Sequence, residues 1–130
     1  MYRLFIKYDN YGEIISKLSL PAEDVEIILG AKQEGENFLE VTDEQFRSIN
    51  ETYYIASDGT LTNKIKMPII QSDKVFTNIP ISVKGTTLTI SGVTYPVTDT
   101  TVDLNIDTPG TYTVIFKGFP YMDTIFLVTV

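Results

Sequence analysis

The chain has 130 residues, of which 43% are apolar and 21% are charged, and these values fit one globular domain or two small ones. It contains neither cysteine nor histidine, which removes disulfides, thiolate chemistry, imidazole base catalysis and nearly all transition-metal sites. A net charge of −7 disfavours binding to a phosphate backbone or an anionic membrane. We therefore expect no catalytic centre, no cofactor or metal, and neither nucleic acid nor a membrane as a partner.

We expect neither a membrane-spanning segment nor a signal peptide. No apolar run approaches the roughly 18 residues of a membrane-spanning helix, and residues 1–7 alternate in polarity instead of forming the apolar part of a signal peptide. We expect a soluble protein that is made in a cytoplasm. The missing cysteines fit a reducing compartment, and they fit equally a particle that must survive oxidising conditions.

The first residues predict a β-hairpin. Apolar and polar residues alternate through Tyr2–Tyr8, turn residues follow at Asp9–Gly12, and a second strand pattern covers Glu13–Leu18. The next apolar run, Val25–Leu29, fits either a strand or the end of a helix, and we favour a strand.

A short helix and a second hairpin are predicted next. Thr42 and Gln45 have the spacing of a capping box, so a helix of two to three turns should follow and end near Ile49. Strand-like residues then flank Ser57–Gly59, whose Asp-Gly pair is typical of a tight hairpin turn. The first part of the chain is therefore expected to be α+β.

Composition changes near Gln71, and we place a domain boundary between residues 71 and 72. Residues 72–130 hold 13 Thr and 8 Val but few charges, and β-branched residues favour strands. Seven short strand patterns alternate with turn signals, as in a β-sandwich. The expected strands are Val75–Thr77, Ile79–Val83, Thr87–Ile90, Val93–Val97, Thr101–Ile106, Tyr112–Lys117 and Thr124–Val130. Inward-facing residues should include Leu104, Ile106, Val114, Phe116, Ile125 and Leu127.

Two groups of acidic residues could in principle bind a metal ion or act in catalysis. Asp99, Asp103 and Asp107 follow one another at intervals of four, but carboxylates spread along a strand are too far apart for calcium, so we expect a solvated face. The cluster Glu34–Glu44 contains five carboxylates, and two of them are explained by the positive end of the predicted helix. Neither group predicts a catalytic or metal site.

The segment Gly118–Asp123 is the strongest candidate for contact with a partner. Its Phe119, Tyr121 and Met122 are residue types that concentrate binding energy, although they also commonly plug the open end of a sandwich. Tyr53 and Tyr54 are further candidates, because consecutive strand residues face opposite sides and at least one should lie on a surface.

Three parts of the sequence carry a family resemblance: residues 5–14, residues 40–67, and the pair of segments Pro109–Val114 and Gly118–Asp123. The first two resemble the opening hairpin and a recurrent segment of small tail and tail-fibre-associated proteins of bacteriophages. The third is similar to the last strands of immunoglobulin-like modules on phage virion proteins. The resemblance implies a mainly β protein, with residues 1–71 as an α+β docking subdomain and residues 72–130 as a seven-stranded immunoglobulin-like sandwich.

The implied function is that of a non-enzymatic virion structural protein of the tail, baseplate, fibre or capsid. It would be made in the bacterial host cytoplasm, contact other phage virion proteins and occur as a homo-oligomer or in many copies. The alternative is a tail-fibre assembly chaperone that is absent from the mature particle. A small carbohydrate-active or cell-wall-degrading domain is a third reading, against which the missing histidine and cysteine and the lack of a paired-carboxylate groove argue.

Overall fold

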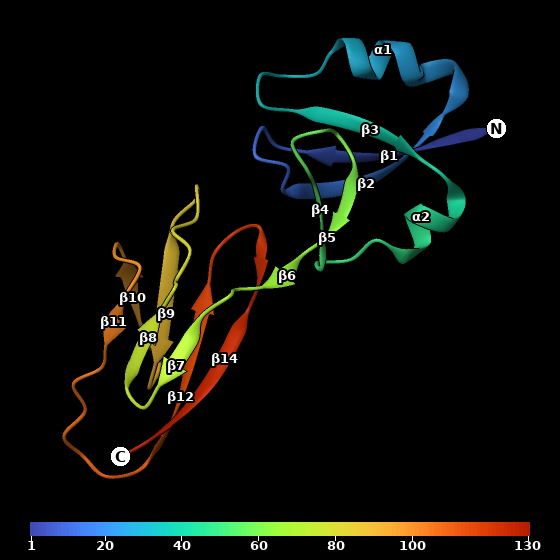
Figure 1. The fold of residues 1–130 in the computed structure, drawn as a ribbon. Coiled ribbons are helices and arrows are strands. Elements are labelled where there is room, and N and C mark those ends of the chain that lie inside the picture. Colours follow the sequence, from blue (N-terminus) through green and yellow to red (C-terminus); the bar gives the residue numbers. More distant parts are fainter. The chain divides into compact units, whose positions relative to one another are not determined.

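The computed structural model describes residues 1–130 and is mainly β, with 47% of residues in strands and 12% in helices (Figure 1). The expected fold class is confirmed at that level. The chain forms two compact units, Met1–Asn63 and Lys64–Val130. The unit boundary lies before the position expected from composition, because the strand that contains residue 71 and the short strand before it both pair with strands of the second unit.

The first unit contains a three-stranded antiparallel sheet in the order β2-β1-β3. Its strands are β1 (Tyr2–Tyr8), β2 (Ile14–Pro21) and β3 (Asn37–Val41). The expected hairpin is confirmed: in its turn, the Asp9 carboxylate accepts hydrogen bonds from the backbone N–H groups of Tyr11 at 2.9 Å and Glu13 at 3.0 Å. Strand β3, which the sequence analysis did not include, pairs with the other edge of β1.

The run expected as a strand after residue 24 is instead helical, and that prediction was wrong. A 3₁₀ turn, η1 (Ala22–Asp24), leads into α1 (Val25–Gly30). Val25 is buried and Ile28 and Leu29 are half-buried, whereas Ile27 is exposed. Buried positions at intervals of three and four are the period of a helix, and the short apolar run concealed that period.

The second helix forms where the sequence predicts it. Helix α2 (Asp43–Ser48) has the capping box, in which the Gln45 backbone N–H donates to the Thr42 hydroxyl at 3.1 Å and the Thr42 N–H donates to the Gln45 side chain at 3.0 Å. The expected hairpin follows as β4 (Tyr53–Ile55) and β5 (Leu61–Asn63). A core of Ile6, Val41 and Ile49 joins the sheet to these elements.

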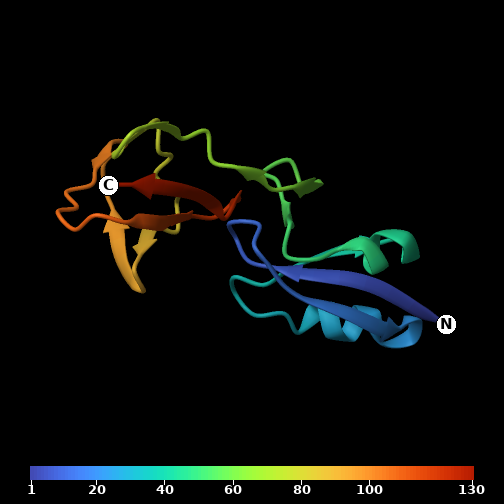
Figure 2. The ribbon, with the colours of Figure 1, turned by 90° about the horizontal axis from the view of Figure 1, so that it is seen from below.

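The second unit contains two larger sheets and a parallel pair of short strands. Its strands are β6 (Ile65–Lys66), β7 (Ile70–Ser72), β8 (Val75–Thr77), β9 (Thr86–Ile90), β10 (Val93–Val97), β11 (Val102–Asp103), β12 (Thr111–Lys117), β13 (Tyr121–Met122) and β14 (Thr124–Thr129). One sheet has the order β10-β9-β12-β14, another β11-β8-β7, and β13 pairs with β6. Within this unit, β7 and β8 lie on one side and β12 and β14 on the other (Figure 2).

Two of the seven expected strands in this unit differ from the structure. Residues 79–83 form no strand: Asn78 has a positive φ of 60°, and Pro80 lacks the N–H that a central strand requires. The pattern over Thr101–Ile106 forms a strand only at β11, and the remainder continues as irregular chain.

The core of the second unit lies between its two larger sheets. The buried cluster is Met67, Phe76, Ile79, Leu88, Val97, Val114, Phe116 and Val128. Val114 and Phe116 therefore face inward as expected, and Leu104 and Ile106 are partly buried against the cluster. The prediction for Ile125 and Leu127 was wrong, because their side chains are 61% and 62% exposed.

Strand β14 has the expected alternation in the opposite phase. Its partner strand places Val114 opposite Phe126 and Phe116 opposite Thr124, so the inward face of β14 carries Thr124, Phe126 and Val128. The buried Thr124 hydroxyl accepts a hydrogen bond from the Met67 backbone N–H at 3.0 Å and donates to the Met122 carbonyl at 3.1 Å. Because both hydrogen bonds of its hydroxyl are made, Thr124 can occupy a position in the core. Hydrophobicity alone would have placed its neighbour Ile125 there.

Candidate binding cleft

The Gly118–Asp123 segment is packed against other residues of the second unit. A side chain at Gly118 would place its Cβ 3.0 Å from Met67 Cε and 3.1 Å from both Ser82 Cβ and Thr86 Oγ1, so glycine permits the close approach. The Tyr121 N–H donates to the Gly118 carbonyl at 2.8 Å, which closes the turn. The Ser82 hydroxyl donates to the Phe119 carbonyl.

Phe119 lies close to two lysine side chains. The Lys64 and Lys84 ammonium groups are 5.6 Å and 5.3 Å from the centre of its ring, within the range of a cation–π contact. Tyr121 and Met122 form β13, opposite Ile65 and Lys66 of β6, and Tyr121 packs against the buried cluster. All three expected contact residues are half-buried, so their role in binding a partner stays a prediction.

Tyr53 and Tyr54 are also half-buried, within the β4–β5 hairpin. Tyr54 lines a hollow of about 270 Å³ in the first unit, together with residues 8–12 and Asn37. The Asn37 amide donates to the Asn10 side chain at 3.0 Å and thereby connects β3 to the first hairpin turn. The structure brings Tyr54 to the turn that the sequence analysis noted, whereas Tyr53 does not line this hollow.

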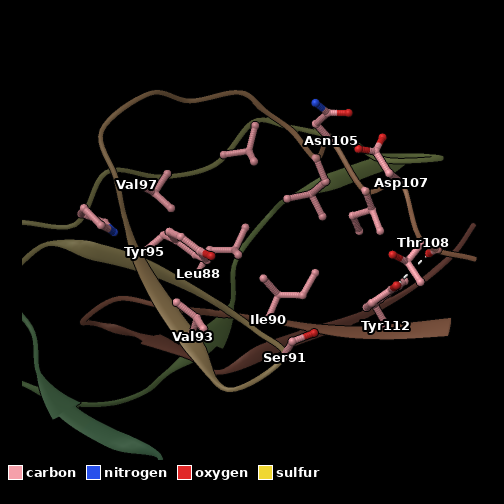
Figure 3. Close-up of a pocket in the computed structure, with 14 residues that line it drawn as sticks. Leu88, Ile90, Ser91, Val93, Tyr95, Val97, Asn105, Asp107, Thr108 and Tyr112 are labelled. Atoms are coloured by element: carbon pink, nitrogen blue, oxygen red, sulfur yellow. Dashed lines mark hydrogen bonds between the residues drawn. The ribbon is translucent and has the colours of Figure 1, made fainter. Parts of the chain in front are cut away.

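The second unit contains a cleft of about 570 Å³ between the hairpin β9–β10 and residues 102–108 (Figure 3). Ligand sites usually have volumes of this order. Its apolar wall includes Leu88, Ile90, Val93 and Tyr95. Its other wall includes Val102, Leu104 and Ile106.

The register of the sheet explains why this cleft is apolar. Val93 pairs with Ile90 and Tyr95 with Leu88, so the four side chains lie on the core-facing side of the sheet. Leu88 is buried, but Val93 is 49% and Tyr95 is 50% exposed. Because β11 has only two residues and the chain after it is irregular, no strand covers this part of the core-facing surface.

Polar groups gather at one end of the cleft. The Tyr112 hydroxyl donates to the Thr108 carbonyl at 2.7 Å, and Asn105 and Asp107 are also among the residues that line the cleft (Figure 3). Asp107 is the one carboxylate among the lining residues, and no lysine or arginine lines the cleft. This arrangement provides apolar contact area and one negative charge, and it lacks the carboxylate pair that glycoside hydrolysis uses.

Two carboxylates of the acidic cluster between residues 34 and 44 form ion pairs within the first unit. Glu40 accepts two hydrogen bonds from the Arg3 guanidinium, each 2.8 Å long, and Glu36 forms an ion pair with Lys7. These cations hold the pKa values of Glu40 and Glu36 below the ordinary value, opposite to what a general acid requires. The structure contains no group of three acidic residues placed to hold a metal ion, so Asp99, Asp103 and Asp107 do not converge.

Sequence analysis did not find the cleft, because it treated β10 as an ordinary sandwich strand. One signal was present: residues 86–98 contain no charged side chain, and Pro96 interrupts a strand pattern. Proline is tolerated in sheets mainly at edge strands, so this pattern indicates an exposed edge without the usual charged protection.

Comparisons of the chain with protein-family models, with curated proteins and with solved structures find no match. Neither α-helix is long or apolar enough to cross a membrane.

Proposed function

We propose that the protein is a non-enzymatic structural component of a bacteriophage virion that acts by docking onto other virion proteins, in several copies. The observation that carries this proposal is the uncovered apolar cleft beside β10. Val93 and Tyr95 lie on the core-facing side of their sheet and are still half exposed. Exposed apolar surface within a concave site is characteristic of binding surfaces.

The proposal includes an immunoglobulin-like, seven-stranded sandwich for the second unit. In support, the sheets β10-β9-β12-β14 and β11-β8-β7 contain seven strands and share one buried cluster. The phage-like segments of the sequence support the virion assignment. A structural role is also consistent with a chain that lacks cysteine and histidine.

The experiment is to purify phage particles from infected cells and to measure this protein in them by quantitative mass spectrometry. A fixed number of copies per particle, retained after a high-salt wash, is expected of a virion component. A protein that is needed for infectivity but absent from purified particles would instead be an assembly chaperone. Full infectivity and normal particles in a deletion strain would contradict both roles.

A pair of variants connects the proposal to the cleft. Tyr95→Ser removes an aromatic side chain from the cleft, and Leu127→Ser removes a similarly exposed apolar side chain from the outer face of β14. Both proteins should fold, as checked by thermal unfolding. We expect only Tyr95→Ser to lower the copy number per particle, and equal loss in both variants would contradict docking through the cleft.

A further inference from the structure

The cleft beside β10 has a geometry that selects among possible occupants. On one wall, Val93, Tyr95 and Val97 are alternate residues of β10. On the other wall, Val102, Leu104 and Ile106 are also alternate residues, and all three are half-buried. Alternate residues of the strand β10 lie about 6–7 Å apart on one face. On the second wall the alternation is one of burial, because β11 ends at Asp103 and the chain after it is irregular. Both walls thus present apolar side chains at alternate positions of the sequence.

The charges beside the cleft have the same repeat. Asp103, Asn105 and Asp107 alternate with the apolar residues of the second wall and are exposed. No lysine or arginine occurs between Thr86 and Phe116. Lys74 is the cation of the neighbouring strand pair, where its carbonyl accepts a hydrogen bond from the Leu104 N–H at 2.9 Å. Asp103 and Asp107 against this one lysine leave a net negative charge along the wall. An occupant with positive charges on its solvent-facing side is favoured electrostatically, and an anionic occupant is repelled.

The free edge of β10 restricts how an occupant is held. Ser91 and Gly92 form a two-residue turn with positive φ angles of 51° and 77°, which makes Ile90 and Val93 the hydrogen-bonded pair of the hairpin. The backbone groups of Thr94 and Pro96 therefore face the free edge. Because Pro96 has no N–H, this edge offers a donor only at Thr94. Side chains inside the cleft, and not a continuous backbone ladder, must hold the occupant.

From these three observations, we infer that the cleft receives an extended segment of a partner protein whose apolar residues alternate with lysine or arginine. Its apolar side chains fill the space above Val93 and Tyr95, and its cations face Asp103 and Asp107. The inference rests on the proposed docking function and specifies the chemistry of the partner.

The test uses the full chain, labelled with ¹⁵N, and two synthetic peptides with the same apolar residues. One has the sequence Lys-Val-Lys-Leu-Lys-Val-Lys, and the other has glutamate at each lysine position. We expect the lysine peptide to shift the amide resonances of Val93, Tyr95, Leu104 and Ile106. The glutamate peptide should bind at least about 10-fold more weakly, and higher salt should weaken the lysine peptide because its charge contacts are exposed.

Variants localise the effect. Tyr95→Ser should abolish the shifts, and the double change Asp103→Asn with Asp107→Asn should weaken the lysine peptide several-fold, whereas Leu127→Ser on the outer sheet face should bind it as the original protein does. The inference is overturned if neither peptide shifts the cleft resonances at millimolar concentration or if both bind equally. It is also overturned if those resonances shift when the protein alone is concentrated, because a second copy then fills the cleft.

The peptide result and the particle result are independent. Peptide binding in the cleft by a protein that is absent from particles would refute the proposed function and leave the inference intact. Incorporation into particles without any peptide binding would refute the inference and leave the proposed function intact.

Discussion

The phenyl rings of Phe76 on β8 and Phe116 on β12 meet with their centres 5.2 Å apart and their planes tilted by 59°. The two residues belong to different sheets of the second unit. Both side chains have no exposed surface, and each ring also contacts Phe126 of β14. Tilted aromatic pairs contribute stabilising energy beyond that of their burial. The contacts among these three rings therefore stabilise the packing of the two sheets against each other.

Replacing Phe116 with alanine should therefore lower the free energy of unfolding by about 3–5 kcal/mol. The loss arises from the missing apolar contacts and from the cavity left between the sheets. Chemical denaturation of the full chain, followed through a signal of the second unit, measures it. Leu127→Ala is the matched control, because this side chain is exposed on the neighbouring strand, and a change within about 0.5 kcal/mol is expected. A larger loss for Leu127 than for Phe116 would reverse the assignment of faces.

Gly12 should tolerate no side chain. Its φ is +93°, and an added Cβ would lie 1.9 Å from the Ile55 carbonyl oxygen. The Gly12 carbonyl also accepts a hydrogen bond from the Ile55 N–H at 2.8 Å, so the two segments cannot move apart without breaking this bond. Gly12→Ala should cost about 1–2 kcal/mol for the left-handed backbone and about 1–3 kcal/mol more for the overlap.

Gly59 provides the control for this substitution. Its φ is +83°, but an added Cβ meets nothing within 4 Å. Gly59→Ala should therefore show only the backbone cost. Both variants are compared by denaturant unfolding of the full chain, followed through a signal of the first unit. Equal losses would mean that the close approach to Ile55 does not determine the requirement for glycine.

The Arg3–Glu40 pair should make the stability of the first unit depend on pH. The guanidinium holds the pKa of Glu40 below its ordinary value in the folded state, while the unfolded chain has a pKa near 4.3. A lowered folded pKa stabilises the protein fully above the unfolded value, and this contribution is lost as the pH falls through the folded pKa. Stability should therefore decline on acidification below about pH 4.3.

Two measurements check this dependence. The carboxyl carbon of Glu40, followed by NMR during an acid titration, should report a pKa below that of an unpaired glutamate and return toward the ordinary value in Arg3→Met. The slope of unfolding free energy against pH should be shallower in Glu40→Gln. Since Arg3 stays charged over the whole range, an unchanged slope in Glu40→Gln would show that the pair does not contribute.

The sequence predicted features that depend on local chemistry. The capping box at Thr42 and the hairpin turn at Asp9 are determined by side-chain hydrogen bonds to nearby backbone, and both form as expected. The phase of β14 was not predictable in this way, because Thr124 is buried only through its distant partner Met67. Helix α1 was missed for a related reason: residues 25–29 contain four apolar residues and Glu26, and so short a run has no clear period until one side is buried.

For the candidate site, too, the sequence predicted what depends on local composition and missed what depends on the assembled unit. Aromatic composition drew attention to Phe119, Tyr121 and Met122, which the structure places partly within packing contacts. The cleft was not found because it depends on the shortness of β11, where an alternating pattern continues through Ile106 without forming a strand. Strand length and the coverage of a sheet are properties of the assembled unit, and hydrophobic alternation does not encode them.

The Gly118–Asp123 segment provides the last prediction, in which Tyr121 and Met122 should behave differently. They are consecutive residues of β13, so their side chains point to opposite sides. Tyr121 packs against the buried cluster, and Tyr121→Ser should lower the melting temperature of the second unit. Met122 is not among the residues packed on that cluster, and Met122→Ser should leave the melting temperature nearly unchanged. If this segment contacts a virion partner, Met122→Ser should also reduce the copy number per particle. Normal incorporation of a folded Met122→Ser protein would exclude Met122 as a contact and leave the cleft beside β10 as the proposed docking surface.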